Sequence, residues 1–115
     1  MKDPHEESRE RLLQIERSIA AIKQYVKGKT QNIFCTTAIL HDAVLLQFVI
    51  IGEAIVHVEN DLLNKYDYPW YKVKSFRNMI AHEYFNIKLP AVWKIIEMEL
   101  TPLEVLIKQI LKNEF

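Results

Sequence analysis

Glycine and proline, the residues that interrupt helices most strongly, are rare in this chain and lie almost only at the ends of apolar repeats. The sequence holds two glycines and four prolines in 115 residues. Five of these six fall where a repeat begins or ends, and they are Pro4, Gly28, Pro69, Pro90 and Pro102. Between them, apolar residues recur at three- and four-residue steps, the spacing of one helix face. The pattern predicts an all-α bundle of about five helices, in one domain spanning residues 1–115.

The first helix is predicted from its two ends. Asp3 is the expected N-cap, and Pro4 suits the first turn because no N–H is needed there. Gly28 is expected to end the helix, since glycine readily adopts the left-handed conformation that follows a last turn. The apolar stripe of this helix is Leu12, Ile15, Ile19, Ile22 and Val26.

A second helix is expected from about Thr30 or Asn32 to about Asn64, and it should be the central one. Apolar residues surround most of its axis between Ile39 and Ile55, which predicts the most buried position in the bundle. Gly52 costs about 1 kcal/mol relative to alanine inside a helix. A close crossing by another helix is a sufficient structural reason for it.

Three further helices follow. The third should begin near Pro69, because proline disfavours helical geometry in the residue before it. The segment "FNIKLP" should end it, and a fourth helix should begin at residue 89 or 90. In "TPLE" we expect Thr101 to cap a fifth helix, with Pro102 in its first position and Glu104 completing a capping box.

Charge, cysteine content and the N-terminal sequence indicate the cellular compartment of the protein and the kind of partner it can bind. Fifteen basic side chains balance fifteen acidic ones, so any site for a polyanion must be local. Cys35 is the single cysteine and can form no intrachain disulfide, as is usual in a reducing cytosol. The polar start "MKDPHEESRE" is unlike a signal peptide, and Thr36–Val58 holds too many polar residues for a membrane span. We therefore expect a cytoplasmic protein that does not enter a membrane.

The segment Ser75–Phe85, "SFRNMIAHEYF", concentrates polar side chains in an otherwise apolar helix. Helical geometry places Asn78 and His82 on one stripe, and Arg77 and Tyr84 on a neighbouring one. Arg77 and His82 diverge by about 140° around the axis. Either the arginine bends toward the histidine, or two copies of the helix converge in a dimer. The core-facing and close-packing side is expected to hold Ile80 and Ala81.

These residue types suit phosphate chemistry. An arginine fork matches phosphate oxygens, and a histidine exchanges protons near neutral pH. We interpret Arg77 and His82 as catalytic residues for RNA cleavage without a metal or other cofactor, and Asn78 as orienting His82 or the phosphate. Tyr84 offers a phenol that can bind phosphate or accept a group. The alternative is structural: an arginine paired with an acid elsewhere, a surface histidine and a tyrosine at the rim.

The segment resembles the R-x-x-x-x-H-x-Y motif of HEPN-domain toxins of the HepT type. Arg77, His82 and Tyr84 fall on the three defined positions, and Asn78 matches the polar residue usual after the arginine. The resemblance covers nearly the whole chain. "IIGEAI" is similar to the central-helix signature of that family, and "YPW", the motif and "VWKIIEMELTPL" follow in its order.

That resemblance implies a fold, an activity and a partner. HepT-like proteins are up-and-down, HEPN-like helical bundles that form homodimers, in which two R-x-x-x-x-H motifs share one cleft. They are metal-independent ribonuclease toxins of toxin–antitoxin pairs. The antitoxin is a small MNT-type nucleotidyltransferase, MntA, which transfers AMP to the motif tyrosine. Carried over, Arg77 and His82 are catalytic and Tyr84 is the AMPylation site. AMP there would add negative charge and bulk where RNA must bind.

Two carboxylates interrupt the apolar central helix. Because a carboxylate inside a fold needs a partner, we expect Glu53 and Asp42 to pair with Arg77 or with a tyrosine hydroxyl, as supports of the site. His41 and His57 lack ligand-like spacing with each other and with Cys35, so no metal is expected.

Basic and aromatic residues gather around the motif. From Lys65 to Lys94 six basic residues outnumber two acidic ones, which indicates either a solvated face or a rim that follows RNA phosphates. Aromatic residues before the motif suit base stacking or packing, and they are Tyr66, Tyr68, Trp70 and Tyr71.

Two other functions remain open on sequence alone. The chain has no glycine-rich phosphate loop of its own, so it is a partner of a nucleotidyltransferase and not that enzyme. One alternative is a non-catalytic subunit that presents nucleotide or substrate to such an enzyme. The other is a structural domain in which the motif only forms a dimer contact.

Overall fold

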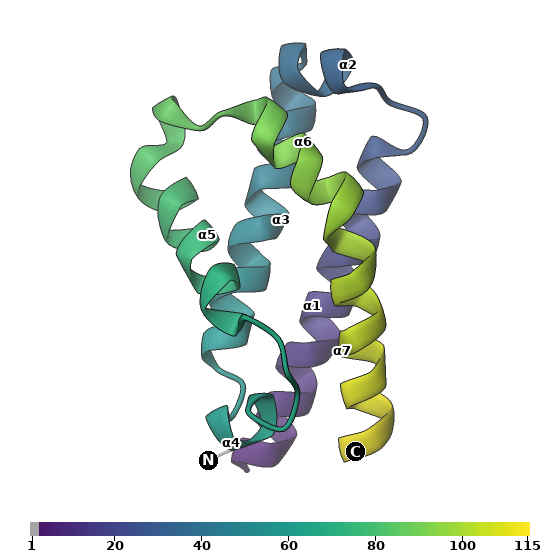
Figure 1. Ribbon diagram of the computed structural model, residues 1–115, viewed down its shortest axis with the longest axis vertical. Coiled ribbons are helices and arrows are strands. Elements are labelled where there is room, and N and C mark those ends of the chain that lie inside the picture. The colour runs from purple at the N-terminus through teal and green to yellow at the C-terminus, as the bar shows by residue number, and fades with distance from the viewer. Residues whose placement is uncertain (1–2) are drawn as a thin grey trace.

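The computed structural model describes residues 3–115, which form seven α-helices and one short 3-10 helix (Figure 1). These elements are α1 (Pro4–Val26), α2 (Gln31–Thr36), α3 (Ala38–Val56), α4 (Asn60–Leu63), α5 (Trp70–Glu83), η1 (Tyr84–Asn86), α6 (Leu89–Met98) and α7 (Leu100–Glu114). The described residues contain no strand, so the all-α prediction is confirmed.

The long helices run alternately up and down along one axis. Helix α1 rises from the N-terminal end, α3 descends beside it, α5 rises again, and α6 with α7 returns to the end where the chain began (Figure 1). Helix α3 packs against both α1 and α5, and α7 packs against α1. The up-and-down arrangement is therefore as predicted, with α3 in the middle.

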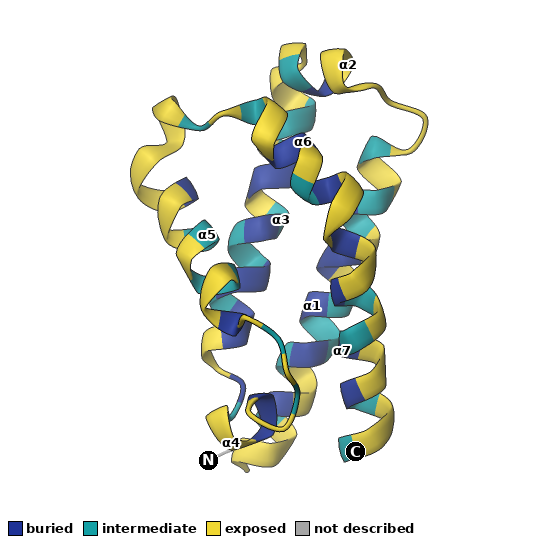
Figure 2. Cartoon of the chain, in the orientation of Figure 1, coloured by how far each residue is buried: buried dark blue, intermediate teal, exposed yellow. Residues whose placement is uncertain are grey.

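The first helix matches its prediction at both ends and along its length. The carboxylate of Asp3 accepts a hydrogen bond from the backbone N–H of His5, and Gly28 has a φ of 72°. Four positions of the predicted stripe, Leu12, Ile15, Ile19 and Ile22, are fully buried, and burial of each stabilises the fold by roughly 1.5–3 kcal/mol. Buried positions of α1, α3 and α7 face one another along the bundle (Figure 2).

The prediction of one long second helix is wrong, because three helices occupy that span. Thr37 is extended, with φ −110° and ψ 97°, and separates α2 from α3. At the other end, the backbone N–H of Glu59 donates a hydrogen bond to the hydroxyl of buried Ser8 in α1, at 3.0 Å. That hydroxyl also donates to the Glu59 carboxylate at 3.2 Å. A contact with a distant helix thus ends α3 and starts α4.

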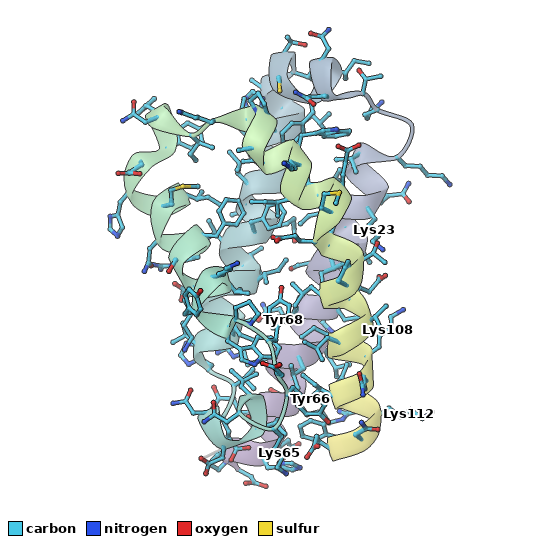
Figure 3. The ribbon with its side chains drawn as sticks, in the orientation of Figure 1. Lys23, Lys65, Tyr66, Tyr68, Lys108 and Lys112 are labelled. Carbon is cyan, nitrogen blue, oxygen red and sulfur yellow. The ribbon has the colours of Figure 1, made fainter. Side chains whose placement is uncertain are left out.

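The predicted capping box of the last helix is also wrong. Helix α7 begins at Leu100 and no side chain caps it. The Thr101 hydroxyl instead accepts a hydrogen bond from Lys23 Nζ at 2.8 Å, and the Glu104 carboxylate accepts another at 2.7 Å. Lys23 reaches α7 from α1 (Figure 3). The two side chains that were expected to cap α7 therefore connect α7 to α1 through Lys23.

Helix α3 is long and apolar enough to cross a membrane if length and composition alone are considered. An 18-residue window within Ala38–Val56 has a mean hydropathy of 1.9, and 39% of that window is buried within the bundle. Two neighbouring helices pack along it, and it carries Asp42 and Glu53. The central helix of a soluble bundle has the same length and composition, and we interpret α3 as such a helix.

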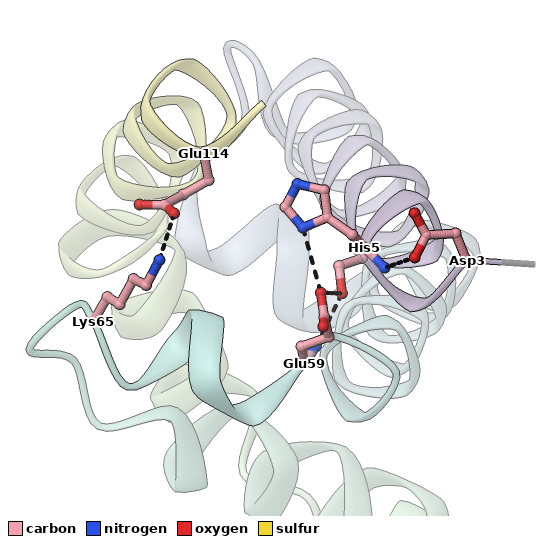
Figure 4. A network of polar contacts seen from close by, with 6 residues as sticks. Asp3, His5, Glu59, Lys65 and Glu114 are labelled. Carbon is pink, nitrogen blue, oxygen red and sulfur yellow. Dashed lines mark hydrogen bonds and ion pairs between the residues drawn. The ribbon is translucent and has the colours of Figure 1, made fainter.

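A polar network joins the first turn of α1 and the end of α7 to the segments on either side of α4. Lys65 Nζ donates to the Glu114 carboxylate at 3.0 Å (Figure 4), and the Tyr66 hydroxyl donates to the same carboxylate at 2.8 Å. On the other side, His5 lies 3.5 Å from Glu59 (Figure 4), and its ring stacks on that of Phe115. The hydrogen bonds from Tyr66 and Lys65 lower the pKa of Glu114.

We expect Glu114→Gln to lower the melting temperature at neutral pH, and to lower it less at acid pH. The depressed pKa means that the contact stabilises the fold above the usual carboxyl value of 4.5. Its contribution is lost as the pH falls through the lower folded value. Melting followed by circular dichroism from pH 7 to pH 3 measures this. Glu97→Gln, an exposed glutamate of α6, is the matched control. A difference between Glu114→Gln and wild type that stays constant over this range would contradict the prediction.

Candidate functional site

The close approach of α5 to α3 is made possible by Gly52. A Cβ at Gly52 would collide with Cβ of Arg77, and would lie 2.7 Å from its Cγ and 3.4 Å from the backbone oxygen of Val73. The predicted close crossing is therefore confirmed. Its effect is to set the base of the Arg77 side chain directly against the central helix.

Arg77 is held by partners on both helices. Its Nη2 forms an ion pair with Glu53 of α3, and its Nη1 donates to the Asn78 Oδ1 at 3.0 Å. The Arg77 side chain is 31% exposed and that of Glu53 is 45% exposed. The buried Nε has no hydrogen-bond partner among the described residues. The guanidinium is therefore fixed at the surface, with further N–H groups on its terminal nitrogens for an anion.

Tyr84 forms a second contact with α3. It opens η1, directly after α5, and its hydroxyl donates a short hydrogen bond to Asp42 Oδ1. This hydrogen bond raises the pKa of Tyr84, and burial and the negative charge of Asp42 add to the effect. The prediction that both carboxylates of the central helix pair with Arg77 or a tyrosine hydroxyl is confirmed. Their role as supports of a site stays a prediction.

His82 stands apart from these contacts. It is exposed, in the last turn of α5, and it makes no hydrogen bond or ion pair within residues 3–115. Asn78, expected to orient His82 or a phosphate, bonds to Arg77 in this chain. Within one chain, Arg77, Asn78 and Glu53 therefore form one group of contacts, and Tyr84 and Asp42 form another. The His82 side chain makes no hydrogen bond or ion pair with either group, and its position five residues after Arg77 turns it to another side of α5.

Several large apolar side chains of α3 and η1 are exposed to solvent. On α3, Ile39 is 87% exposed, and Leu46 and Val56 are each more than half exposed; Phe85, directly after Tyr84, is 95% exposed. These four side chains form what we call the apolar face. The expectation that α3 is buried around most of its axis is therefore wrong for one side of the helix, because no element of the described chain covers it.

Other expectations for this region need correction. Ala81 was expected to pack closely, but it is exposed, and only Ile80 enters the core. Trp70 is buried, with its indole N–H donated to the Leu63 carbonyl at 3.0 Å. Of the four aromatic residues before the motif, only Tyr71 is largely exposed. Of these four residues, only Tyr71 is therefore exposed enough to stack on a base. Phe85 is also exposed, which the helical pattern did not indicate.

A separate cavity lies on the other side of α5. It has a volume of about 520 Å³ and is lined by side chains of α3, α5 and the α6–α7 junction, most of them apolar. Lys72, one of the basic residues expected to follow RNA, lines this cavity. Within the described part of the chain, no three His, Cys, Asp or Glu side chains gather closely enough to hold a metal ion.

Comparison with known proteins identifies similar chains. The model of the family "Ribonuclease HepT-like" matches residues 15–110. A protein of Methanocaldococcus jannaschii named "Gamma-glutamylcyclotransferase and putative RNase" is 32% identical over 97 residues, which are 84% of this chain and 44% of that protein. A "Putative RNase" of Caldanaerobacter subterraneus is 31% identical over 90 residues, covering 77% of this chain and 80% of that one.

A third relative bears the family's name. The "Probable ribonuclease HepT" of Thermococcus cleftensis is 29% identical over 63 residues, which are 54% of this chain and 57% of that protein. This chain therefore spans less than half of the Methanocaldococcus protein but most of the Caldanaerobacter one. No solved structure matches the chain.

Gly52→Ala should destabilise the chain although alanine is the better helix former. The added methyl pushes α5 away from α3, and overpacking of this kind costs about 1–3 kcal/mol, more than the roughly 1 kcal/mol gained in helix propensity. Urea unfolding measures the difference.

A double-mutant cycle attributes that cost to the contact. Arg77→Gly removes both atoms that the new methyl would meet, so the two substitutions together should cost less than the sum of their separate costs. Arg77→Ala keeps Cβ and is the matched control, with a smaller coupling. Unchanged stability of Gly52→Ala, or additive costs in the cycle, would contradict the prediction.

Proposed function

The chain belongs to the ribonuclease HepT-like family, and from that membership we propose that it is a metal-independent endoribonuclease whose active site forms between two copies of the chain. The observation that carries the proposal is the separation of Arg77 from His82. Glu53 holds the arginine at the surface beside α3, whereas the exposed histidine, five residues later, is turned about 140° away from it around the axis of α5. A single chain thus offers a phosphodiester only one of the two groups, and a second copy supplies the other.

The chemistry follows from the two side chains. The 2′-hydroxyl of one nucleotide attacks the neighbouring phosphorus, and a neutral His82 takes the hydroxyl proton. As the bond to the 5′-oxygen breaks, an imidazolium returns a proton to the leaving oxygen. Arg77 donates N–H groups to the non-bridging oxygens, where negative charge grows in the transition state. Fixing the guanidinium in advance through Glu53 and Asn78 reduces the loss of side-chain freedom when RNA binds.

The apolar face supports the homodimer. Its four side chains, Ile39, Leu46, Val56 and Phe85, flank the residues that bind Arg77 and Tyr84. In a two-fold dimer the same patch of both copies meets, so one apolar face covers the other. Such an arrangement places the two α5 helices near the dimer axis. Arg77 of one copy then faces His82 of its partner across a shared cleft.

Tyr84 is the proposed point of control. We assign it as the acceptor of AMP from an MNT-type nucleotidyltransferase that acts as antitoxin, so that the pair forms a toxin–antitoxin system. The tyrosine side chain is 43% exposed and is therefore open to a second protein. A nucleotide attached there would bring a phosphodiester charge to the cleft and repel RNA.

The principal test is RNA cleavage by purified protein in the presence of a chelator. We expect Arg77→Ala and His82→Ala each to lose at least about a hundredfold in rate, the scale usual for one acid–base or oxyanion-stabilising group. Arg9→Ala, an exposed arginine of α1, is the matched control. Circular dichroism must show that all variants remain folded.

Two results would contradict the catalytic assignment. Full cleavage by both variants would remove Arg77 and His82 from the reaction. Absence of cleavage by rigorously purified wild type, together with nucleotide binding that depends on Arg77, would favour the alternative of a non-catalytic nucleotide-binding subunit.

A mixed dimer tests whether two copies share one site. Co-expression of Arg77→Ala and His82→Ala chains with different affinity tags, followed by tandem purification, isolates the heterodimer. It holds one intact arginine and one intact histidine on different copies. We expect it to cleave RNA well above either parent homodimer. A heterodimer no more active than its parents would show that each copy uses its own arginine and histidine.

A further inference from the structure

We propose that Asp42 accepts the proton of Tyr84 when AMP is transferred to that tyrosine, and that His41 positions the Asp42 carboxylate. The inference rests on the proposed function, in which Tyr84 is the acceptor. It adds that this chain supplies the base for its own modification. The nucleotidyltransferase then needs to bring only the nucleotide and the means to activate it.

The contact between the two side chains has the geometry that proton transfer requires. The Tyr84 hydroxyl donates its proton directly to Asp42 Oδ1, so donor and acceptor are already in hydrogen-bond contact. Asp42 lies on α3 and Tyr84 on η1, forty-two residues later. Half of the Asp42 side chain is exposed, so an incoming nucleotide can approach the phenol from solvent.

His41 lies behind the carboxylate in a defined orientation. Its Nδ1 lies 3.0 Å from the Phe34 carbonyl oxygen. A carbonyl only accepts, so Nδ1 carries the proton of this hydrogen bond. The Nε2 atom lies 3.6 Å from Asp42 Oδ1, and it attracts the carboxylate when the ring is an imidazolium, in which both nitrogens carry protons. The histidine side chain is only 17% exposed and its ring packs edge-on against Phe34. It therefore limits the positions that Asp42 can adopt.

The reaction balances without any further reactant. The Tyr84 oxygen attacks the α-phosphorus of ATP, a new P–O bond forms, and the bond to the pyrophosphate oxygen breaks. The phenolic proton passes to Asp42 and pyrophosphate leaves with the electron pair. Water later removes the proton from the exposed carboxylate. A base is needed because a phenol, with an ordinary pKa of 10.0, is protonated at neutral pH, and the hydrogen bond to Asp42 raises the pKa of Tyr84 further.

The Asp42→Asn variant distinguishes a role of Asp42 as general base from an effect of its negative charge alone. The amide oxygen still accepts the tyrosine hydrogen bond, but the side chain no longer takes a proton. Loss of the negative charge should lower the pKa of Tyr84 and weaken repulsion of ATP. If charge alone mattered, transfer would therefore become faster. If Asp42 is the base, transfer becomes slower by roughly 10²–10⁴-fold, the usual contribution of general-base catalysis.

The experiment measures two quantities on the same proteins. Ultraviolet titration follows Tyr84 as the difference between each protein and its Tyr84→Phe version. Transfer of radiolabelled AMP from ATP by the MNT-type nucleotidyltransferase gives the rate, with the modified residue mapped by mass spectrometry. Asp67→Asn, an exposed aspartate before α5, is the matched control. We expect only Asp42→Asn to combine a lower Tyr84 pKa with slower transfer.

The outcomes distinguish this inference from the proposed function. Labelling of wild type at Tyr84 with equal or faster labelling of Asp42→Asn would overturn the role of Asp42 and leave Tyr84 as the acceptor. Failure of wild type to be labelled at Tyr84 would overturn the proposed control by AMP, and the base with it.

His41 is tested by replacement and rescue. His41→Phe keeps the ring but removes both nitrogens, and should slow transfer several-fold. His41→Gln places an amide near the Nε2 position and should restore most of the rate, since it can again hold the carboxylate. Equal losses in both variants, or none, would overturn the positioning role.

Discussion

The close contact between α3 and α5 is the constraint on which the candidate site depends. Because Gly52 has no side chain, the base of Arg77 rests on the central helix and its guanidinium reaches Glu53 across the helix surface. The same antiparallel packing carries the end of α5 toward the beginning of α3, where Tyr84 meets Asp42. A larger residue at position 52 would separate the two helices and place both polar contacts out of reach.

Much of this arrangement follows from local rules. The N-cap at Asp3, the left-handed Gly28 and the buried stripe of α1 are consequences of neighbouring residues in the sequence, so the sequence predicts them well. The partners of Asp42 and Glu53 could also be predicted, because a carboxylate in an apolar helix needs a hydrogen-bond donor. Residues 77–84 contain an arginine and a tyrosine, which are donors of this kind. Gly52 could be interpreted as the site of a helix crossing for a similar reason. The free-energy cost of a glycine inside a helix indicates a compensating contact.

The remaining features depend on contacts between distant parts of the chain, which no local pattern contains. Ser8 binds Glu59, fifty-one residues away, just beyond the end of α3, and Lys23 donates hydrogen bonds to two residues that were expected to cap α7. The sequence pattern of α3 indicates burial on nearly all sides, and it cannot distinguish burial within one chain from burial against another. The exposed Ile39, Leu46 and Val56 lie on the side of α3 that no element of the described chain covers.

One property of α3 links the two polar contacts. Asp42 and Glu53 lie eleven residues apart, about three helical turns, and therefore on the same side of the helix. A small rotation of α3 about its own axis would carry both carboxylates in the same direction, away from or toward Tyr84 and Arg77 together. The Arg77–Glu53 and Tyr84–Asp42 contacts thus depend on one rigid body, so a change at one contact is felt at the other. By linkage, the coupling free energy between the two contacts is the same in both directions.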